Sequence, residues 1–177
     1  TEQMARDCAE FGLPVLALRP HARPRQEINP IRERVRRVGY EGGEQYLGPW
    51  REIMERACKA RGWEFAVNPP KLADLDIVVA LRSSTGYAAR EWKSGIKLAN
   101  AQGAGVPCIL NRAAGYTETA SGAEKWADTM GEMDAALDAL TSRKARAAAA
   151  CGLRRAAPLL PEISNEYGIW LQQLSKS

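Results

Sequence analysis

The 177-residue sequence contains no apolar run approaching the roughly 20 residues that a membrane-spanning helix needs. No secretory signal is visible either, because the opening segment TEQMARDCAE is polar and has a helical pattern. The sequence also lacks an initiator methionine, so we expect a fragment or a processed chain. These absences predict a cytoplasmic protein with no membrane span.

Cysteine and histidine, which build most disulfide and metal sites, are scarce. The four cysteines lie far apart without a CxxC pair, which predicts buried, reduced thiols and no metal site. They are Cys8, Cys58, Cys108 and Cys151. The single histidine, His21, lies in the segment RPHARP, and a lone histidine in such a linker is usually incidental.

Charge of one sign is only slightly in excess. The formal charge of +4 is mild for a dedicated nucleic-acid-binding protein. The excess is uneven, however, because residues 19–37 hold seven arginines and two glutamates. Since arginine forms bidentate contacts with phosphate and carboxylate groups, this segment is either a solvated linker or an anion-binding surface.

Apolar strand patterns alternate with amphipathic helix patterns from residue 35 onward. Strands are predicted at 35–40, 63–67, 77–81 and 106–110, and helices at 45–62, 92–105, 129–140 and 143–157. Thr129 and Glu132 have the spacing of a capping box. Residues 82–91 and 111–127 are predicted to be loops. The alternation predicts an α/β fold with a doubly wound, mostly parallel, Rossmann-like sheet.

The two ends of the chain differ from this pattern. A short helix, a strand at Pro14–Leu18 and a linker rich in proline and arginine are predicted before residue 35. The C-terminal segment predicts an amphipathic helix that needs something to pack on. Its apolar stripe consists of Ile163, Tyr167, Trp170, Leu171 and Leu174. Trp50 and Trp170 are predicted to be core residues.

Three loops follow the carboxyl ends of predicted strands and should meet at one edge of the sheet, where such folds bind ligands. The first contains Gly42 and Gly43, which allow backbone to approach a ligand closely. The second supplies polar and cationic side chains. These are Arg82, Lys93, Ser94 and, one turn further along, Lys97.

The third loop contributes the segment Gly115-Tyr116-Thr117-Glu118, which offers backbone amides followed by a carboxylate. Cations and backbone amides at a helix start suit an anion, and a diphosphate is the obvious candidate. A carboxylate or amide nearby suits sugar hydroxyls. The combination of the three loops predicts a ligand site, although each element alone is more often structural.

These residues resemble the donor-binding half of retaining, GT4-like glycosyltransferases of the GT-B fold. WKSGIKLANAQGAGVPCI and GYTETASG are similar to that family's Lys-Ser-x-x-Lys…Ala…Gly-x-Pro pattern and its Gly-x-Tyr-x-Glu continuation, with the tyrosine directly after the glycine. The matching positions are Lys93, Ser94, Lys97, Ala101, Gly105, Pro107, Gly115 and Glu118. The resemblance covers residues 35–177.

The resemblance implies three parts. Residues 1–34 would be the tail of an acceptor domain plus its linker, residues 35–155 a Rossmann-like nucleotide-sugar-binding domain, and residues 156–177 a helix crossing back to the acceptor domain. A GT-B enzyme needs an acceptor domain of similar size, yet only about 30 residues precede Val35. We therefore expect a missing acceptor domain or a partner chain.

The resemblance also implies roles. Lys97, with Arg82 or Lys93, would hold the diphosphate of a UDP- or GDP-sugar and stabilise the leaving nucleotide, with no metal and no further cofactor. Trp92 could line the donor pocket.

The backbone amides of Tyr116 and Thr117 would bind phosphate oxygens, and Glu118 would face the diphosphate and ribose. Asn100 stands where the family often has a ribose-binding glutamate, and an amide binds a diol more weakly.

Three functions stay open at this point. The first is transfer of a sugar to an unknown acceptor. The second is a non-catalytic nucleotide-sugar-binding or regulatory module. The third uses the arginine-rich segment, as a nucleic-acid-binding protein or a phage-type enzyme that glycosylates DNA bases, because VRRVGYEGGEQYLGPW resembles glycosyltransferase-like proteins of bacteria and phages.

Overall fold

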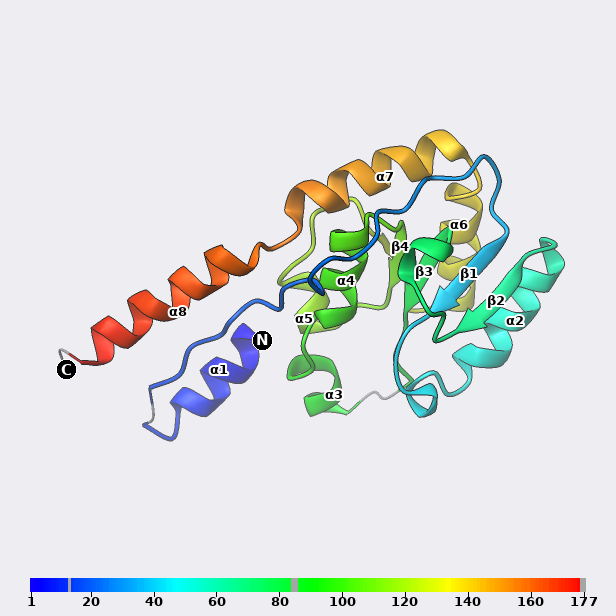
Figure 1. Ribbon diagram of the computed structural model, residues 1–177. Coiled ribbons are helices and arrows are strands. Elements are labelled where there is room, and N and C mark those ends of the chain that lie inside the picture. The colour runs from blue at the N-terminus through cyan, green and yellow to red at the C-terminus, as the bar shows by residue number, and fades with distance from the viewer. Residues whose placement is uncertain (13, 84–85, 176–177) are drawn as a thin grey trace.

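The chain folds around one parallel sheet. The computed structural model describes residues 1–12, 14–83 and 86–175, and five strands in the order β2-β1-β3-β4-β5 form the sheet (Figure 1). They are β1 (Arg37–Tyr40), β2 (Glu64–Val67), β3 (Ile77–Ala80), β4 (Cys108–Leu110) and β5 (Lys125–Trp126). All four neighbouring pairs run parallel. The predicted α/β fold with a mostly parallel sheet is confirmed.

The described residues form eight α-helices, and those in the body of the molecule cover both faces of the sheet. They are α1 (Glu2–Ala9), α2 (Trp50–Ala60), α3 (Tyr87–Glu91), α4 (Ile96–Ala104), α5 (Ala114–Thr117), α6 (Met130–Ala139), α7 (Arg143–Ala156) and α8 (Leu160–Leu174). Side chains of α2 and α6 share one core cluster with the strands, and those of α4 and α5 share the other. The capping box of Thr129 and Glu132 begins α6, as predicted.

The core follows from the apolar run of β3. Ile77 and Val79 point into the cluster with α2 and α6, while Val78 and Ala80 point into the cluster with α4. Because successive residues of a strand face opposite sides, a strand covered on both faces must be apolar throughout. All four residues are buried, and this position places the end of β3 at the centre of the molecule.

Several sequence predictions need correction. The strand predicted at Pro14–Leu18 is wrong, because these residues pair with no strand in the part of the chain that the structure describes. An extended apolar segment forms a strand only where a free sheet edge accepts it. The predicted loops 82–91 and 111–127 contain α3, α5 and β5, which are too short to show a period. Residues 84 and 85 of the first loop lie outside the described residues.

The predicted linker is solvent-exposed along most of its length, but a few of its residues anchor it to the domain. Asn29 is buried, and its side-chain amide donates to the carbonyl oxygens of Ala73 and Leu75 at 3.1 and 2.5 Å. A Cβ at Gly103 of α4 would lie 2.3 Å from the Cβ of Ala22, so glycine is needed for this contact. The segment from Ala22 onward is therefore part of the body.

Arginines of this segment are largely paired with carboxylates. The pairs are Arg19 with Glu166, Arg23 with Glu41, Arg32 with Asp76, and Arg37 with Glu64. Pairing of this kind neutralises positive charge that would otherwise attract the phosphates of a nucleic acid. This arrangement does not support the predicted DNA acceptor, which stays a prediction.

Arg146 fixes the linker to the turn between α6 and α7. Its side chain, 1% exposed, donates to the carbonyl oxygens of Leu140 and Thr141 at 2.9 and 2.6 Å. It also donates to those of Arg32 and Glu33 at 2.7 and 3.2 Å. One buried guanidinium thus joins two segments far apart in the sequence.

Arg146→Met is expected to lower the free energy of unfolding by about 2 kcal/mol, because four carbonyl oxygens lose a charged donor while the alkyl volume is kept. Urea unfolding measures this change. Arg143→Met is the matched control, since Arg143 is exposed, and it should change stability by less than about 0.5 kcal/mol. Equal stabilities of the two variants would contradict the role assigned to Arg146.

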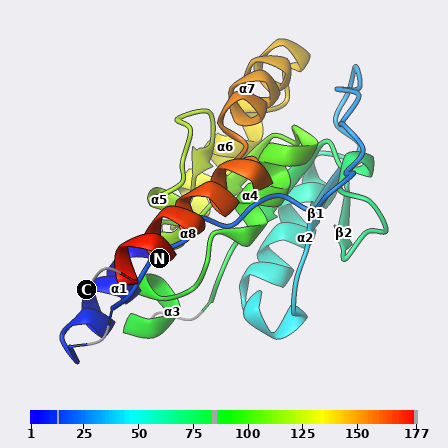
Figure 2. The same cartoon turned by 60° about the vertical axis from the view of Figure 1, so that its left-hand side comes forward.

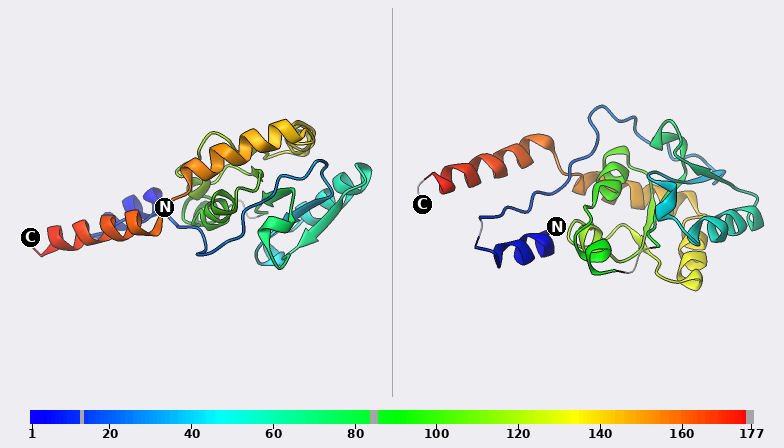
Figure 3. Two further views of the ribbon diagram at one scale, coloured as in Figure 1. Left: turned by 45° about the horizontal axis from the view of Figure 1, so that its top comes forward. Right: turned by 90° about the horizontal axis from the view of Figure 1, so that it is seen from below.

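The N-terminal segment and α8 project from the body at the same end of the molecule (Figures 2 and 3). Ile163 of α8 is buried, whereas Tyr167, Ile169 and Leu171 are 45–48% exposed. Trp170 is half-buried and stacks on Tyr167 of the same helix, so its prediction as a core residue is wrong. The stripe that needed a packing partner is largely uncovered.

Burial of the cysteines agrees with the prediction at Cys58 and Cys108 only, because Cys8 is half-buried and Cys151 is exposed. Trp50, predicted to lie in the core, is half-buried and packs against the cluster of α2 and α6.

Within residues 1–12, 14–83 and 86–175, no helix is both long and apolar enough to traverse a bilayer.

Candidate functional site

The sheet has a switch point between β1 and β3. The chain leaves β1 toward β2 on one side and leaves β3 toward β4 on the other, so the loops after these two strands diverge. Ligands of such sheets bind in the crevice outside the carboxyl ends of the strands at this point. The residues that follow β1 and β3 are therefore the first place to search.

A pocket of about 660 Å³ opens there. Its size lies within the range of small-molecule sites. The lining residues are Tyr46, Arg82, Gly86, Tyr87, Ala88, Ala89, Lys93, Ser94, Ile96 and Lys97. All four polar side chains predicted from the second loop, those of Arg82, Lys93, Ser94 and Lys97, meet in this pocket.

Lys97 lies in the first turn of α4, and the body of the helix is buried against the sheet. Its Nζ atom is 2.5 Å from the Tyr40 hydroxyl oxygen and 3.9 Å from the centroid of that ring. Burial, reinforced by the charge of Arg82 and opposed by that of Glu41, lowers the pKa of Lys97 to about 8. The protein thus holds this ammonium group where water solvates it poorly.

Arg82 directly follows β3 and lies over the ring of Tyr116, with Cζ 4.5 Å from the centroid. Its guanidinium donates to the carbonyl oxygen of Ser94 at 2.8 Å and, at 3.4 Å, to that of Ala89. These bonds use two of the five N–H donors and orient the group. The rest of the guanidinium is available to a ligand in the pocket.

Lys93 and Ser94 lie in the loop before α4, which begins at Ile96. The predicted helix 92–105 therefore starts too early. Both residues are exposed. The Nζ atom of Lys93 lies 5.6 Å from the centroid of the Tyr46 ring, a cation–π distance. The loop before α4 therefore directs a further cation into the pocket.

The three cations share a wall of the pocket without counter-ions. None of the ion pairs found among the described residues involves Arg82, Lys93 or Lys97. Like charges held together and partly desolvated destabilise a fold, so this arrangement is typical of a site that binds an anion. The structure thus brings together Arg82, Lys93 and Lys97, which the sequence places at one edge of the sheet.

The glycine turn after β1 borders Lys97. Gly42 has φ +139°, and a Cβ there would lie 2.9 Å from both Cε and Nζ of Lys97. Its N–H donates to the Asn68 side chain at 2.8 Å, so this amide is already used. Gly43 offers its carbonyl oxygen to the Tyr40 hydroxyl at 3.1 Å. Neither glycine, both predicted to contact the donor, lines the pocket; Gly42 packs beside Lys97, and Gly43 accepts from Tyr40.

Asn100, predicted to contact the donor, points elsewhere. It is buried in α4, accepts a hydrogen bond from the backbone N–H of Arg23 at 3.1 Å and donates to Glu41 at 3.3 Å. Glu41 also pairs with the guanidinium of Arg23. In this structure the side chain fixes the linker to α4 and does not line the pocket.

The amides of Tyr116 and Thr117, predicted to bind phosphate, are used by α5. Both donate to the carbonyl oxygen of Ala113, at 2.9 and 3.0 Å. Gly115 instead packs backbone against backbone, since a Cβ there would lie 2.3 Å from the Lys93 carbonyl oxygen and 2.7 Å from the Gly95 nitrogen. The third loop thus supports the second loop and carries the ring of Tyr116 under Arg82.

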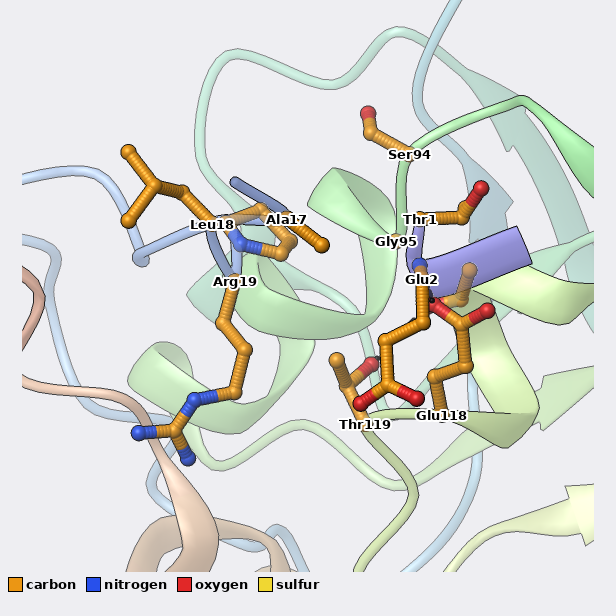
Figure 4. Close-up of a pocket in the computed structure, with 11 residues that line it drawn as sticks. Thr1, Glu2, Ala17, Leu18, Arg19, Ser94, Gly95, Glu118 and Thr119 are labelled. Carbon is orange, nitrogen blue, oxygen red and sulfur yellow. Dashed lines mark hydrogen bonds between the residues drawn. The ribbon is translucent and has the colours of Figure 1, made fainter. Parts of the chain in front are cut away.

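The Glu118 carboxylate is occupied by the N-terminus of α1. It accepts hydrogen bonds from the backbone N–H groups of Glu2 and Gln3 at 2.9 and 3.3 Å. Figure 4 shows Glu118 next to Glu2, across a small hollow of about 50 Å³ from Arg19. That volume is far below the range of small-molecule sites, and the hollow borders the larger pocket at Ser94.

A further contact of α1 reaches the pocket wall. Asp7 accepts hydrogen bonds from the Tyr87 hydroxyl at 2.8 Å and from the Trp92 indole N–H at 2.7 Å. These bonds hold the pKa of Asp7 below its ordinary value. Trp92 thereby faces α1, and only Tyr87 of the pair lines the pocket.

Sequence reasoning missed the aromatic residues of the site. Tyr40 ends β1 and looks like an ordinary core residue, Tyr46 falls at the start of the predicted helix 45–62, and Tyr87 lies in a predicted loop. The one sequence signal that could have identified Tyr40 is its closeness to Gly42 and Gly43. Among residues 1–12, 14–83 and 86–175, no three His, Cys, Asp or Glu side chains come together as metal ligands would.

Comparisons with known proteins support the fold. No protein-family model and no curated protein sequence matches the chain. The solved structure of WaaG, a glycosyltransferase involved in lipopolysaccharide biosynthesis, matches with a TM-score of 0.54 and 17% identity, over 79% of this chain and 51% of that one. The chain thus spans about half the length of WaaG.

Two further structures are similar at lower scores. The glycotransferase of kitacinnamycin matches with a TM-score of 0.46 and 18% identity, over 81% of this chain and 43% of that one. A glycosyltransferase from Rickettsia africae ESF-5 matches with a TM-score of 0.49 and 12% identity, over 100% of this chain and 53% of that one. The match to WaaG, with 17% identity, shows the fold alone, and function has to be argued from the site.

Proposed function

We propose that this chain is the sugar-nucleotide-binding half of a glycosyltransferase of the GT-B type. The observation that carries the proposal is the group of three cations without counter-ions, at the switch point of the sheet and beside the turn of Gly42. The fold shared with WaaG is consistent with it. The retaining, GT4-like assignment rests on the sequence resemblance alone.

Arg82, Lys93 and Lys97 would hold the diphosphate of a nucleotide sugar in the pocket. During transfer the bond between the sugar and the terminal phosphate oxygen breaks, and its electron pair remains on the leaving diphosphate. The acceptor oxygen forms the new bond to the sugar carbon, and its proton passes to the leaving diphosphate. Cations already in place stabilise the developing negative charge without having to reorganise, which is a large contribution to catalysis.

The acceptor would bind against a second unit. The cleft of a GT-B enzyme lies between two domains, and this chain has the fold of one. The uncovered apolar side chains of α8 and of the N-terminal segment support such a neighbour, because contiguous exposed apolar surface is typical of an interface. We propose a further domain or a partner chain there.

Nucleotide binding tests the proposal directly. UDP and GDP are expected to raise the melting temperature, UMP less so and uridine hardly at all, because the cations bind phosphate charge. If neither nucleoside diphosphate binds to the protein, or to its complex with an acceptor domain, the proposal fails. Transfer of sugar by that complex would exclude the non-catalytic alternative.

The affinity for UDP is expected to fall as the pH rises through about 8. Lys97 loses its proton in that range in the free protein, whereas arginine stays charged. Because an anion favours the charged form of Lys97, binding should take up protons at pH 8 to 9. Calorimetry in buffers of different ionisation enthalpy measures this uptake, and proton release on binding would contradict the site.

A further inference from the structure

Tyr40 occupies a junction between the glycine turn and Lys97. It is the last residue of β1 and is fully buried. Its hydroxyl donates to the carbonyl oxygen of Gly43 at 3.1 Å and accepts from Lys97, whose Nζ atom is 2.5 Å away. Its ring lies below the same ammonium group, 3.9 Å from centroid to nitrogen.

A hydroxyl group has one donor and two acceptor positions. The donor of Tyr40 is fixed on Gly43, so a lone pair of its oxygen faces Lys97. The ammonium of Lys97 has three donors, and this contact uses one of them. The other two stay free for a ligand in the pocket.

We propose that Tyr40 is a positioning residue of the anion site, whose hydroxyl holds the ammonium group of Lys97 and the turn at Gly42 and Gly43 in one arrangement. This inference rests on the proposed function, because the anion is the diphosphate of a nucleotide sugar. Tyr40 acts through Lys97 and does not itself line the pocket.

A neutral hydroxyl suits this task better than a carboxylate. An aspartate or glutamate would also orient Lys97, but it would cancel the positive charge that the ligand needs. Burial raises the pKa of Tyr40 to about 12, so the hydroxyl keeps its proton in the working range. The other charged groups that act on Lys97 are Arg82, after β3, and Glu41, after β1, which is already paired with Arg23.

Tyr40→Phe tests the inference, because it keeps the ring and removes only the hydroxyl. UDP binding is expected to weaken 5- to 20-fold, with a melting temperature within about 4 °C of the wild type. Tyr167→Phe, on the projecting helix α8, is the matched control and should leave UDP affinity unchanged within twofold. Tyr40→Phe with wild-type affinity would overturn the inference.

A second measurement does not depend on UDP. The titration of Lys97 can be followed by NMR of the ¹³Cε atoms, assigned by comparison with Lys97→Met. Loss of the accepting hydroxyl disfavours the ammonium form, so the midpoint in Tyr40→Phe should be lower by roughly 0.5. A merely structural role of Tyr40 predicts lost stability and an unchanged midpoint, which would also overturn the inference.

The two readouts separate the possible failures. If the wild type binds no nucleoside diphosphate but the Lys97 midpoint falls in Tyr40→Phe, the proposed function is wrong and the contact stands. If UDP binds to the wild type and Tyr40→Phe changes neither affinity nor midpoint, the proposed function stands and the role of Tyr40 is wrong.

Discussion

Lys97→Met is expected to make the free protein more stable and at the same time to remove most of its affinity for UDP. The partly buried ammonium group is close to Arg82 and has no counter-ion among the described residues, so its removal relieves desolvation and repulsion. The diphosphate loses one charged donor, which should weaken binding roughly 10- to 100-fold. Thermal unfolding with and without UDP measures both effects.

The stabilisation should depend on pH in a defined way. The pKa of Lys97 falls from its ordinary value near 10.5 to about 8 on folding, so between these values the unfolded chain binds more protons than the folded one. Wild-type stability therefore rises with pH from about 8 to 10, and the cost of the buried charge is fully present below 8. The difference between Lys97→Met and the wild type should shrink across that window.

Lys59→Met is the control for this experiment, because Lys59 is exposed on α2, away from the pocket. Lys59→Met should change the free energy of unfolding by less than about 0.5 kcal/mol and should leave the affinity for UDP unchanged. A Lys97→Met protein that is less stable than the wild type at pH 7 would show that the ammonium group is paired in solution. The anion site would then lose its main support.

Gly115→Ala is expected to destabilise the protein by on the order of 3 kcal/mol, because the new methyl group has no space. It would lie 2.3 Å from the Lys93 carbonyl oxygen and 2.7 Å from the Gly95 nitrogen. Backbone atoms cannot turn away as a flexible side chain can, so the loop before α4 must shift. Since that loop carries Lys93, UDP affinity should fall as well.

Gly131→Ala separates this effect from the general consequence of replacing a glycine. Gly131 lies in the first turn of α6, and a Cβ there meets nothing within 4 Å. Alanine should therefore stabilise by roughly 0.5–1 kcal/mol through helix propensity. Chemical denaturation of both variants measures the contrast, and a Gly115→Ala protein as stable as wild type would show that the two loops do not touch.

The sheet and the cationic wall could be predicted because both follow from short-range patterns. An apolar run such as Ile77–Ala80 has few uses other than a buried strand, and parallel topology brings the carboxyl ends of such strands together. Arg82 and Lys97 could therefore be placed at one edge without knowledge of any contact. Their positions required only the order of the elements.

Hydrogen-bond partners could not be predicted in the same way. The amides of Tyr116 and Thr117 are free in an open loop and used in a helical turn, and the segment is too short for its sequence to decide between them. Asn100 and Glu118 are engaged by segments 77 and 115 or more residues earlier in the sequence. Such contacts depend on how α1 and the linker pack, which no local pattern reveals.

The packing of the linker limits how α1 can move relative to the sheet. Ala22 touches α4, and Asn29 is buried against the sheet domain, so a rotation has to occur in the stretch between α1 and residue 22. Roughly a dozen residues span at most about 40 Å when fully extended. The ion pair of Arg19 with Glu166, 2.6 Å long, connects this stretch to α8. That ion pair is exposed on both sides and contributes less than about 1 kcal/mol. The hydrogen bonds of α1 to Glu118, Tyr87 and Trp92 are more numerous, so α1 should stay with the sheet domain if α8 moves.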